Sequence, residues 1–365
     1  MVGWGSNVTY TAPNFQYQFV AAAPNKPNPA LVTTSPLDCG YRRKLMGWIK
    51  NSLATCAAPL TPNNFSISHR GSPVMYPEHS MQGYSAAVAM GANWIECDTA
   101  VTQDFQPVCR HSQCDLHTTT NVLFNATLAA KCSVPFTPAV LNATSGLVIT
   151  PANVMCCTFD FTLAEFNSLC AIQDLGAGWN AAQNVSDYFS VGAPAFRSNA
   201  FDTLGGGGAC AANPGTLATM GAMVVAAGRN LIPEQKVCDL LCQAKLVAAN
   251  PPLAAGWGCT TGVYCQALVN AWSDKIVGVL NSLTANNRNA TAPNAPFSLG
   301  AAAPGWVLQT FELNTALYVT QRWPMAIICF LYQLNGASLS LTQADPYKGA
   351  QRFRAAAARF MLPRY

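Results

Sequence analysis

The sequence has little charge and no long apolar run. Only 10% of its 365 residues are charged, against about 25% in an ordinary soluble domain, which excludes a charged disordered tail and a coiled coil. No apolar stretch reaches the roughly 18 residues of a transmembrane helix. The first 25 residues lack the basic start and apolar stretch of a signal peptide. The 20 basic and 16 acidic residues leave a net charge of +4, too weak and scattered for nucleic-acid binding.

Two other features favour secretion. Fifteen cysteines are many for a reducing compartment, although buried cysteines can be plain apolar residues. The pairs Cys238/Cys242 and Cys259/Cys265 have no histidines nearby to complete a zinc site. Six Asn-x-Ser/Thr sequons, which also arise by chance, are glycosylation signals of secreted chains: Asn7, Asn64, Asn125, Asn142, Asn184 and Asn289. We therefore predict an extracellular protein with several disulfides, an odd thiol, and a leader that was removed or left out.

The chain divides into two parts by composition. Residues 1–62, rich in Pro and Asn at their start, are predicted to form an N-terminal arm with a short helix over residues 38–58. Residues 63–365 are predicted to form one domain with Cys-rich insertions.

Within the second part, patterns typical of strands alternate with patterns typical of helices. The predicted strands are 65–69, 93–101, 107–111, 229–236, 306–312 and 325–332, and the predicted helices are 80–91, 161–170, 216–227, 263–283 and 348–361. This alternation indicates an α/β fold with a parallel sheet.

Groups that can carry protons or bind metals gather in one short segment. All four histidines lie between residues 69 and 117, together with two of the five glutamates. On a strand, Glu96 and Asp98 would point to the same face, where two carboxylates can bind one hard divalent cation. His69 and His111 each end a predicted strand, and the carboxyl ends of parallel strands meet at one site. A pair of histidines there suits general acid–base catalysis.

This segment resembles the glycerophosphodiester phosphodiesterase family. The elements that carry the resemblance occur in order over residues 69–123: His69-Arg70-Gly71, Pro77-Glu78, Gly91-Ala92, Glu96-x-Asp98 and His111. Weaker likeness continues through residues 157–170, Pro233–Lys236 and residues 306–311, to about residue 332.

The resemblance implies a TIM-type (β/α)8 barrel that hydrolyses a small glycerophosphodiester to glycerol 3-phosphate and an alcohol. Glu96, Asp98 and Glu234 would hold one divalent metal ion, Mg²⁺ or Ca²⁺. His69 and His111 would act as base and acid. The remaining implied residues are Arg70 and Lys236, which would bind the phosphate, and Glu78, which would support the site. Nothing in the sequence fixes the oligomeric state.

Three departures qualify the resemblance. Ser112 stands where the family often has Asp, and His79 stands where it has Asn; we interpret His79 and His117 as structural or rim residues. About five barrel strands can be counted by residue 332, and the 33 residues that follow are too few for three more βα units. Either strands lie hidden in the insertions or the barrel is incomplete at its C-terminal end.

Two alternatives stay open. The first is a secreted phospholipase D or sphingomyelinase D-like enzyme, which shares the two histidines and the Glu-x-Asp pair. The second is a secreted homologue that has lost catalysis and acts in binding. The Pro-Glu element and the Glu234-x-Lys236 strand favour the glycerophosphodiesterase.

Overall fold

A computed structural model describes residues 63–175, 179–194, 197–198, 201, 210–284, 305–323, 326 and 328–330. The predicted N-terminal arm over residues 1–62 and the predicted helix over residues 348–361 lie outside the described residues. Two sequons, Asn7 and Asn289, also lie outside them.

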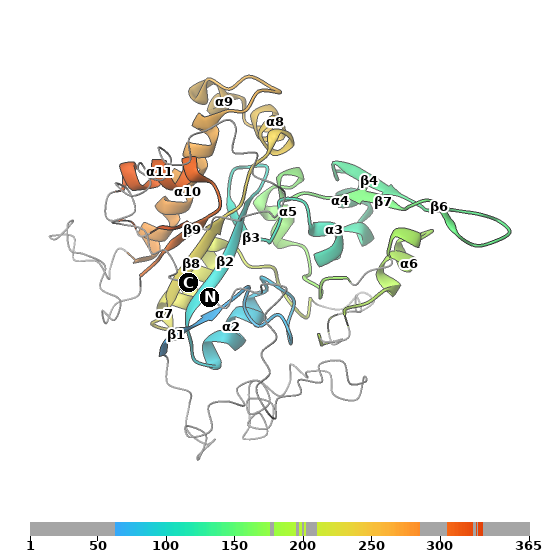
Figure 1. Cartoon of the computed structure of the whole chain (residues 1–365), viewed down its shortest axis with the longest axis horizontal. Coiled ribbons are helices and arrows are strands. Elements are labelled where there is room, and N and C mark those ends of the chain that lie inside the picture. Colours follow the sequence, from blue (N-terminus) through green and yellow to red (C-terminus); the bar gives the residue numbers. More distant parts are fainter. Residues whose placement is uncertain are drawn as a thin grey trace, which may run out of the picture.

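The central element is a sheet in which five strands run parallel. Its order is β1-β2-β8-β9-β10, and it lies at the middle of the molecule (Figure 1). The five strands are β1 (Asn63–Ser68), β2 (Ala92–Val101), β8 (Asn230–Gln235), β9 (Leu308–Thr310) and β10 (Ile328–Phe330). The predicted parallel α/β fold is confirmed, and within the described residues the sheet is open, which is consistent with an incomplete (β/α) barrel.

The sixth strand corrects one expectation. Residues 107–111 were predicted as a strand of the parallel set, but β3 (Pro107–Cys109) pairs antiparallel with β2. Thr102 and Phe105 close the turn with a 3.0 Å backbone hydrogen bond, so the chain folds straight back along β2. His111 therefore reaches the site through a hairpin and not at the carboxyl end of a parallel strand.

Helices cover the sheet, and their ends follow capping rules. The Ser80 side chain accepts from Gly83 N to begin α2 (Met81–Ala89), and Thr216 accepts from Thr219 N to begin α7 (Leu217–Ala226). Gly228, with φ of +69°, follows the end of α7. The other helices of this part are α8 (Leu240–Ala249), α9 (Pro251–Trp257), α10 (Gln266–Thr284) and α11 (Leu313–Arg322).

The main core lies between the sheet and these helices. Its apolar side chains come from β2, β8, β9 and β10 on one side and from α7, α10 and α11 on the other, for example Ile95, Leu231, Met220, Trp272 and Val319, each at most 1% exposed. Burial of this apolar area is the main force that holds the sheet in place, and it makes the sheet a rigid support for side chains on its other face.

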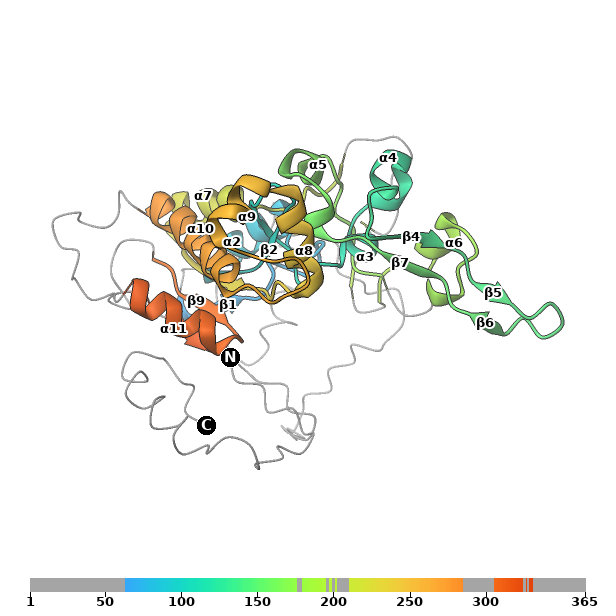
Figure 2. The same cartoon turned by 90° about the horizontal axis from the view of Figure 1, so that it is seen from above.

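A second hydrophobic cluster lies in the segment between β3 and α7. It includes Leu116, Phe161, Phe166 and Tyr188. The sequence predicted one of its helices, α5 (Leu163–Asn167), with the capping box of Thr162 and Glu165. The other elements were not predicted: α3 (Leu116–Thr119), η3 (Val122–Phe124), α4 (Ala126–Ala129), β4 (Val134–Thr137), β5 (Val140–Leu141), β6 (Val148–Thr150), β7 (Asn153–Met155), η4 (Thr158–Asp160), η5 (Trp179–Ala181) and α6 (Val185–Ser190). The β5–β6 hairpin projects away from the rest of the molecule in both views (Figures 1 and 2).

Six disulfides join described cysteines, as the cysteine content predicted. They are Cys97–Cys109, Cys114–Cys157, Cys132–Cys156, Cys170–Cys210, Cys238–Cys242 and Cys259–Cys265. Cys329 is a free thiol among the described residues. None of the helices in the described part combines the length and apolar character needed to cross a membrane.

Candidate active site

Three carboxylates meet on one face of the sheet because of strand register. Glu96 and Asp98 are two residues apart on β2, so their side chains point the same way. Asp98 is in register with Glu234 on the neighbouring parallel strand β8. One oxygen of each residue lies within 4.8 Å of the others, and the three residues are 2%, 0% and 4% exposed. The structure thus brings together the three predicted metal ligands.

Asp98 lies at the centre of a set of donors. Its Oδ2 is 3.0 Å from Arg70 Nε and 3.0 Å from His79 Nε2, and its Oδ1 is 2.9 Å from Lys236 Nζ. Burial by itself would raise the pKa of Asp98, but the His79 hydrogen bond and the positive charges outweigh it and lower that pKa. Asp98 is therefore a carboxylate at neutral pH.

The two glutamates have fewer donors. Glu96 Oε2 accepts from the Arg70 backbone N–H at 2.7 Å. Glu234 pairs with Lys236 and accepts from the amide of Gln309, its register partner on β9. Burial and the neighbouring charge of Asp98 raise the pKa of both glutamates.

These residues fit a divalent cation. Glu96 Oε1 is buried and has no hydrogen-bond partner among the described residues. Because nearly all buried polar atoms in proteins have a partner, this oxygen is a candidate ligand for an ion. Carboxylate oxygens are the ligands that Mg²⁺ and Ca²⁺ prefer. A cation between the three groups would also remove the repulsion that raises the pKa of Glu96 and Glu234.

The turn after β1 presents the first histidine and arginine. Arg70 and Gly71 have φ of +61° and +88°, a conformation that glycine adopts easily and arginine does not. A Cβ on Gly71 would lie 3.0 Å from the Gly83 backbone carbon, so this position requires glycine. The turn directs Arg70 into the site, where its side chain remains 18% exposed.

The two predicted acid–base histidines lie near this cluster, since the charges of Arg70 and Asp98 act on both imidazoles. His69 and His111 are exposed, whereas the three carboxylates are buried. Partial burial and the positive charge of Arg70 lower the pKa of both imidazoles, that of His111 to about 4. Both residues are therefore neutral at pH 7 in the free protein.

Glu78 does not join the carboxylate triad. Its Oε2 is 2.9 Å from Arg70 Nη1 and its Oε1 is 2.5 Å from Arg197 Nη2. The two guanidinium groups outweigh the effect of burial and lower the pKa of Glu78 to about 2. Glu78 therefore bridges Arg70 to the segment between β3 and α7, from which Arg197 comes.

The structure also places residues that the sequence did not assign. His79 is buried beside Asp98 and is not a rim residue. His117 lies away from this cluster, where its Nδ1 accepts from Cys156 N at 3.3 Å. Arg197 and Gln309 were missed because no local pattern relates them to the site. His79 could have been suspected, since it directly follows Glu78.

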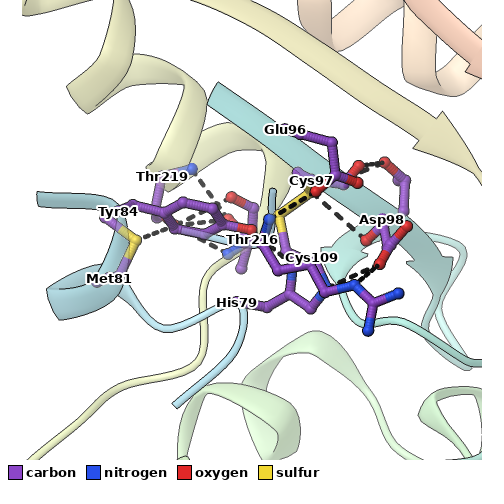
Figure 3. The surroundings of a disulfide bond; sticks show 11 residues. His79, Met81, Tyr84, Glu96, Cys97, Asp98, Cys109, Thr216 and Thr219 are labelled. Carbon is purple, nitrogen blue, oxygen red and sulfur yellow. Dashed lines mark hydrogen bonds and ion pairs between the residues drawn. A yellow bond between two sulfur atoms is a disulfide. The ribbon is translucent and has the colours of Figure 1, made fainter. Parts of the chain in front are cut away.

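A disulfide lies directly behind the carboxylate pair. Cys97 stands between Glu96 and Asp98 on β2, and Cys109 ends β3 two residues before His111 (Figure 3). Both cysteines are fully buried in the main core. The bond therefore holds the strand of the carboxylates to the strand that leads to His111.

Replacing this disulfide with Cys97→Ala/Cys109→Ala is expected to cost about 2–4 kcal/mol of unfolding free energy and to lower kcat, because the two strands lose their covalent link. Chemical denaturation and steady-state kinetics measure the two effects. The control Cys259→Ala/Cys265→Ala removes a disulfide near α10, whose cysteines are only six positions apart, and should leave kcat unchanged. Equal effects of both double variants on kcat would contradict the positioning role of Cys97–Cys109.

Comparison with known proteins agrees with this geometry. The model of the glycerophosphoryl diester phosphodiesterase family matches residues 69–203, which include the His-Arg-Gly turn, Glu96, Asp98 and His111. Residues 69–203 are therefore similar to the glycerophosphoryl diester phosphodiesterase family, although they make up less than half of the chain. The resemblance drawn from the motifs is thus confirmed.

Individual relatives of this family are distant. A Mycobacterium tuberculosis protein named "Probable glycerophosphodiester phosphodiesterase 1" is 37% identical over 54 residues, which are 15% of this chain and 20% of that protein. The match thus spans about a fifth of the length of this curated relative.

Solved structures of the family show low similarity. One from Silicibacter pomeroyi has 14% identity and a TM-score of 0.44 and covers 80% of this chain and 73% of its own. An Oleispira antarctica phosphodiesterase, solved with its product sn-glycerol-3-phosphate, has 13% identity and a TM-score of 0.36 and covers 81% of each chain.

Proposed function

We propose that this protein is a metal-dependent glycerophosphodiester phosphodiesterase that releases glycerol 3-phosphate and an alcohol. The observation that carries the proposal is the buried triad of Glu96, Asp98 and Glu234, with two exposed histidines near it. Arg70 and Lys236 lie in contact with this triad. The family match of residues 69–203 supports the same reaction.

Glu96, Asp98 and Glu234 would hold one Mg²⁺ or Ca²⁺. Such an ion polarises phosphoryl oxygens and orients the substrate when bound. Arg70 and Lys236 would neutralise the phosphodiester, since their side chains remain 18% and 16% exposed beside the triad.

His69 and His111 would carry the proton transfers. One imidazole removes the proton from the glycerol 2-hydroxyl as its oxygen bonds to phosphorus. The other gives a proton to the alcohol oxygen as the old P–O bond breaks, and water then opens the resulting cyclic phosphate to glycerol 3-phosphate. Glu78 would hold Arg70 in place through its ion pair, and Arg197 would hold Glu78.

The test is release of glycerol 3-phosphate from glycerophosphocholine by the full chain, with chelator and after addition of Mg²⁺ or Ca²⁺. Release that stops with chelator and returns with metal supports the proposal. Release from lysolipid micelles but not from glycerophosphocholine would favour the phospholipase D-like alternative. A folded protein that binds no divalent ion and releases nothing would favour an inactive homologue.

We also propose that the protein is extracellular. Six disulfides in the described part are typical of an oxidising compartment, and the sequon residues Asn125, Asn142 and Asn184 are exposed. Protein made in a eukaryotic secretory pathway should gain mobility on a gel after glycosidase treatment, whereas unchanged mobility would contradict glycosylation.

A further inference from the structure

His79 is a buried histidine that the proposed reaction does not use. Its ring is held at both nitrogens: Nε2 is 3.0 Å from Asp98 Oδ2, and Nδ1 is 2.8 Å from the hydroxyl of Tyr84. His79 and Tyr84 are both buried, with exposed fractions of 1% and 0%. Figure 3 shows His79 beside Tyr84, close to the Cys97–Cys109 disulfide.

His79 links Asp98 to Tyr84 through two hydrogen bonds, one at each ring nitrogen. The carboxylate of Asp98 only accepts hydrogen bonds, so His79 must carry its proton on Nε2. In the tautomer with its proton on Nε2, Nδ1 can accept a hydrogen bond from the hydroxyl of Tyr84. Burial raises the pKa of Tyr84 well above its ordinary value, which keeps the phenol protonated and able to donate.

The backbone holds His79 where its side chain can reach Asp98. The residue has φ of +57°, and such uncommon conformations persist where the surrounding structure enforces them, often at functional sites. Its N–H donates to Arg70 O at 3.1 Å, and its carbonyl accepts from Gly215 N at 2.8 Å. A Cβ on Gly215 would lie 3.0 Å from the Tyr84 ring, so the segment before α7 closes tightly over the pair.

We infer that His79 and Tyr84 form a buried relay that fixes the carboxylate of Asp98 for metal binding, with both acting as positioning residues. This inference rests on the proposed function. Asp98 Oδ2 hydrogen-bonds His79 and forms an ion pair with Arg70. Because Arg70 is also a proposed phosphate ligand, it can turn toward the substrate only if His79 keeps Oδ2 in place. Partners behind a metal ligand typically contribute about 10–100-fold to metal affinity or activity.

The test compares Mg²⁺ affinity, measured by calorimetry on metal-free protein, in four variants. We expect His79→Leu to weaken Mg²⁺ binding by about 10–100-fold. We expect His79→Gln, whose amide can still donate to Asp98, to stay within about threefold of the parent protein. Tyr84→Phe should weaken binding by about 3–10-fold, since it removes only the hydroxyl that orients the imidazole.

Tyr188→Phe is the matched control. Tyr188 is also fully buried, but its hydroxyl has no hydrogen-bond partner among the described residues, so the control should bind Mg²⁺ like the parent. Unfolding midpoints measured in chelator separate metal positioning from general stability, and kcat should fall more than KM rises in Tyr84→Phe. If His79→Leu does not fold, the single-atom change in Tyr84→Phe still decides the question.

Two results would overturn the inference. Equal Mg²⁺ affinity in Tyr84→Phe, Tyr188→Phe and the parent, with the parent binding Mg²⁺, would overturn the relay alone. A parent protein that binds neither Mg²⁺ nor Ca²⁺ would overturn the relay together with the proposed function.

Discussion

Glu96→Gln is expected to abolish saturable binding of Mg²⁺ or Ca²⁺ and to lower phosphodiesterase turnover by about 10³-fold or more. The substitution keeps the shape of the side chain, and the Arg70 N–H can still donate to its carbonyl oxygen. It removes a carboxylate whose buried Oε1 has no hydrogen-bond partner among the described residues. Calorimetry and release of glycerol 3-phosphate measure the two effects.

The same substitution should not destabilise the metal-free protein. Burial and the charge of Asp98 raise the pKa of Glu96, so at neutral pH its charged form lowers the stability of the folded state. A neutral amide removes that penalty, and the unfolding midpoint in chelator should stay equal or rise. Loss of activity then cannot be attributed to unfolding.

Glu165→Gln is the control for this change. Glu165 lies at the start of α5, in a capping box whose geometry glutamine also satisfies, and should retain full metal binding and turnover. Chelator-sensitive turnover that persists in Glu96→Gln would contradict the assignment of the metal ligands.

Much of this site was predictable because its key spacings are local. Alternation on a strand places Glu96 and Asp98 on one face, and the turn of His69, Arg70 and Gly71 directly follows β1. Glu234 was assigned by resemblance, and its register with Asp98 gives the physical reason why a residue 136 positions away shares the site.

The parts that could not be predicted depend on long-range packing. The hairpin of β2 and β3 reverses one strand of an otherwise parallel sheet, and a five-residue pattern does not distinguish the two directions. Arg197 reaches Glu78 across 119 residues of sequence, through a segment whose fold depends on its own core. The role of His79 depends on a left-handed backbone conformation that the sequence pattern does not reveal.

His69→Ala and His111→Ala are each expected to lower kcat by about 10²–10⁴-fold while leaving Mg²⁺ affinity unchanged. Both imidazoles are exposed, and neither belongs to the carboxylate triad. Because the proposed function places the two in one proton-transfer cycle, the double variant should lose little more than the worse single variant. Full additivity of the two losses would indicate independent roles and contradict a shared acid–base cycle.

His117→Gln is the control for these histidine variants. Its side chain can still accept from the backbone N–H of Cys156, and His117 lies away from the triad, so kcat should remain that of the parent. A large loss of kcat in this variant would show that removal of any buried or partly buried histidine impairs the protein.

The pH profiles of kcat/KM and kcat should differ, because kcat/KM reports groups of the free enzyme and kcat reports groups of the substrate complex. Burial and the charge of Arg70 lower the pKa of His111 to about 4 in the free protein, so kcat/KM should decline on the acid side only near that pH and not near 6.5.

The general acid must nevertheless be protonated when the alcohol leaves. A bound phosphodiester anion favours the imidazolium and raises its pKa, so the basic limb of the kcat profile should lie well above pH 4. A kcat profile whose limbs coincide with those of kcat/KM would mean that the substrate's charge does not act on these histidines, and the proton for the leaving alcohol would have to come from another group.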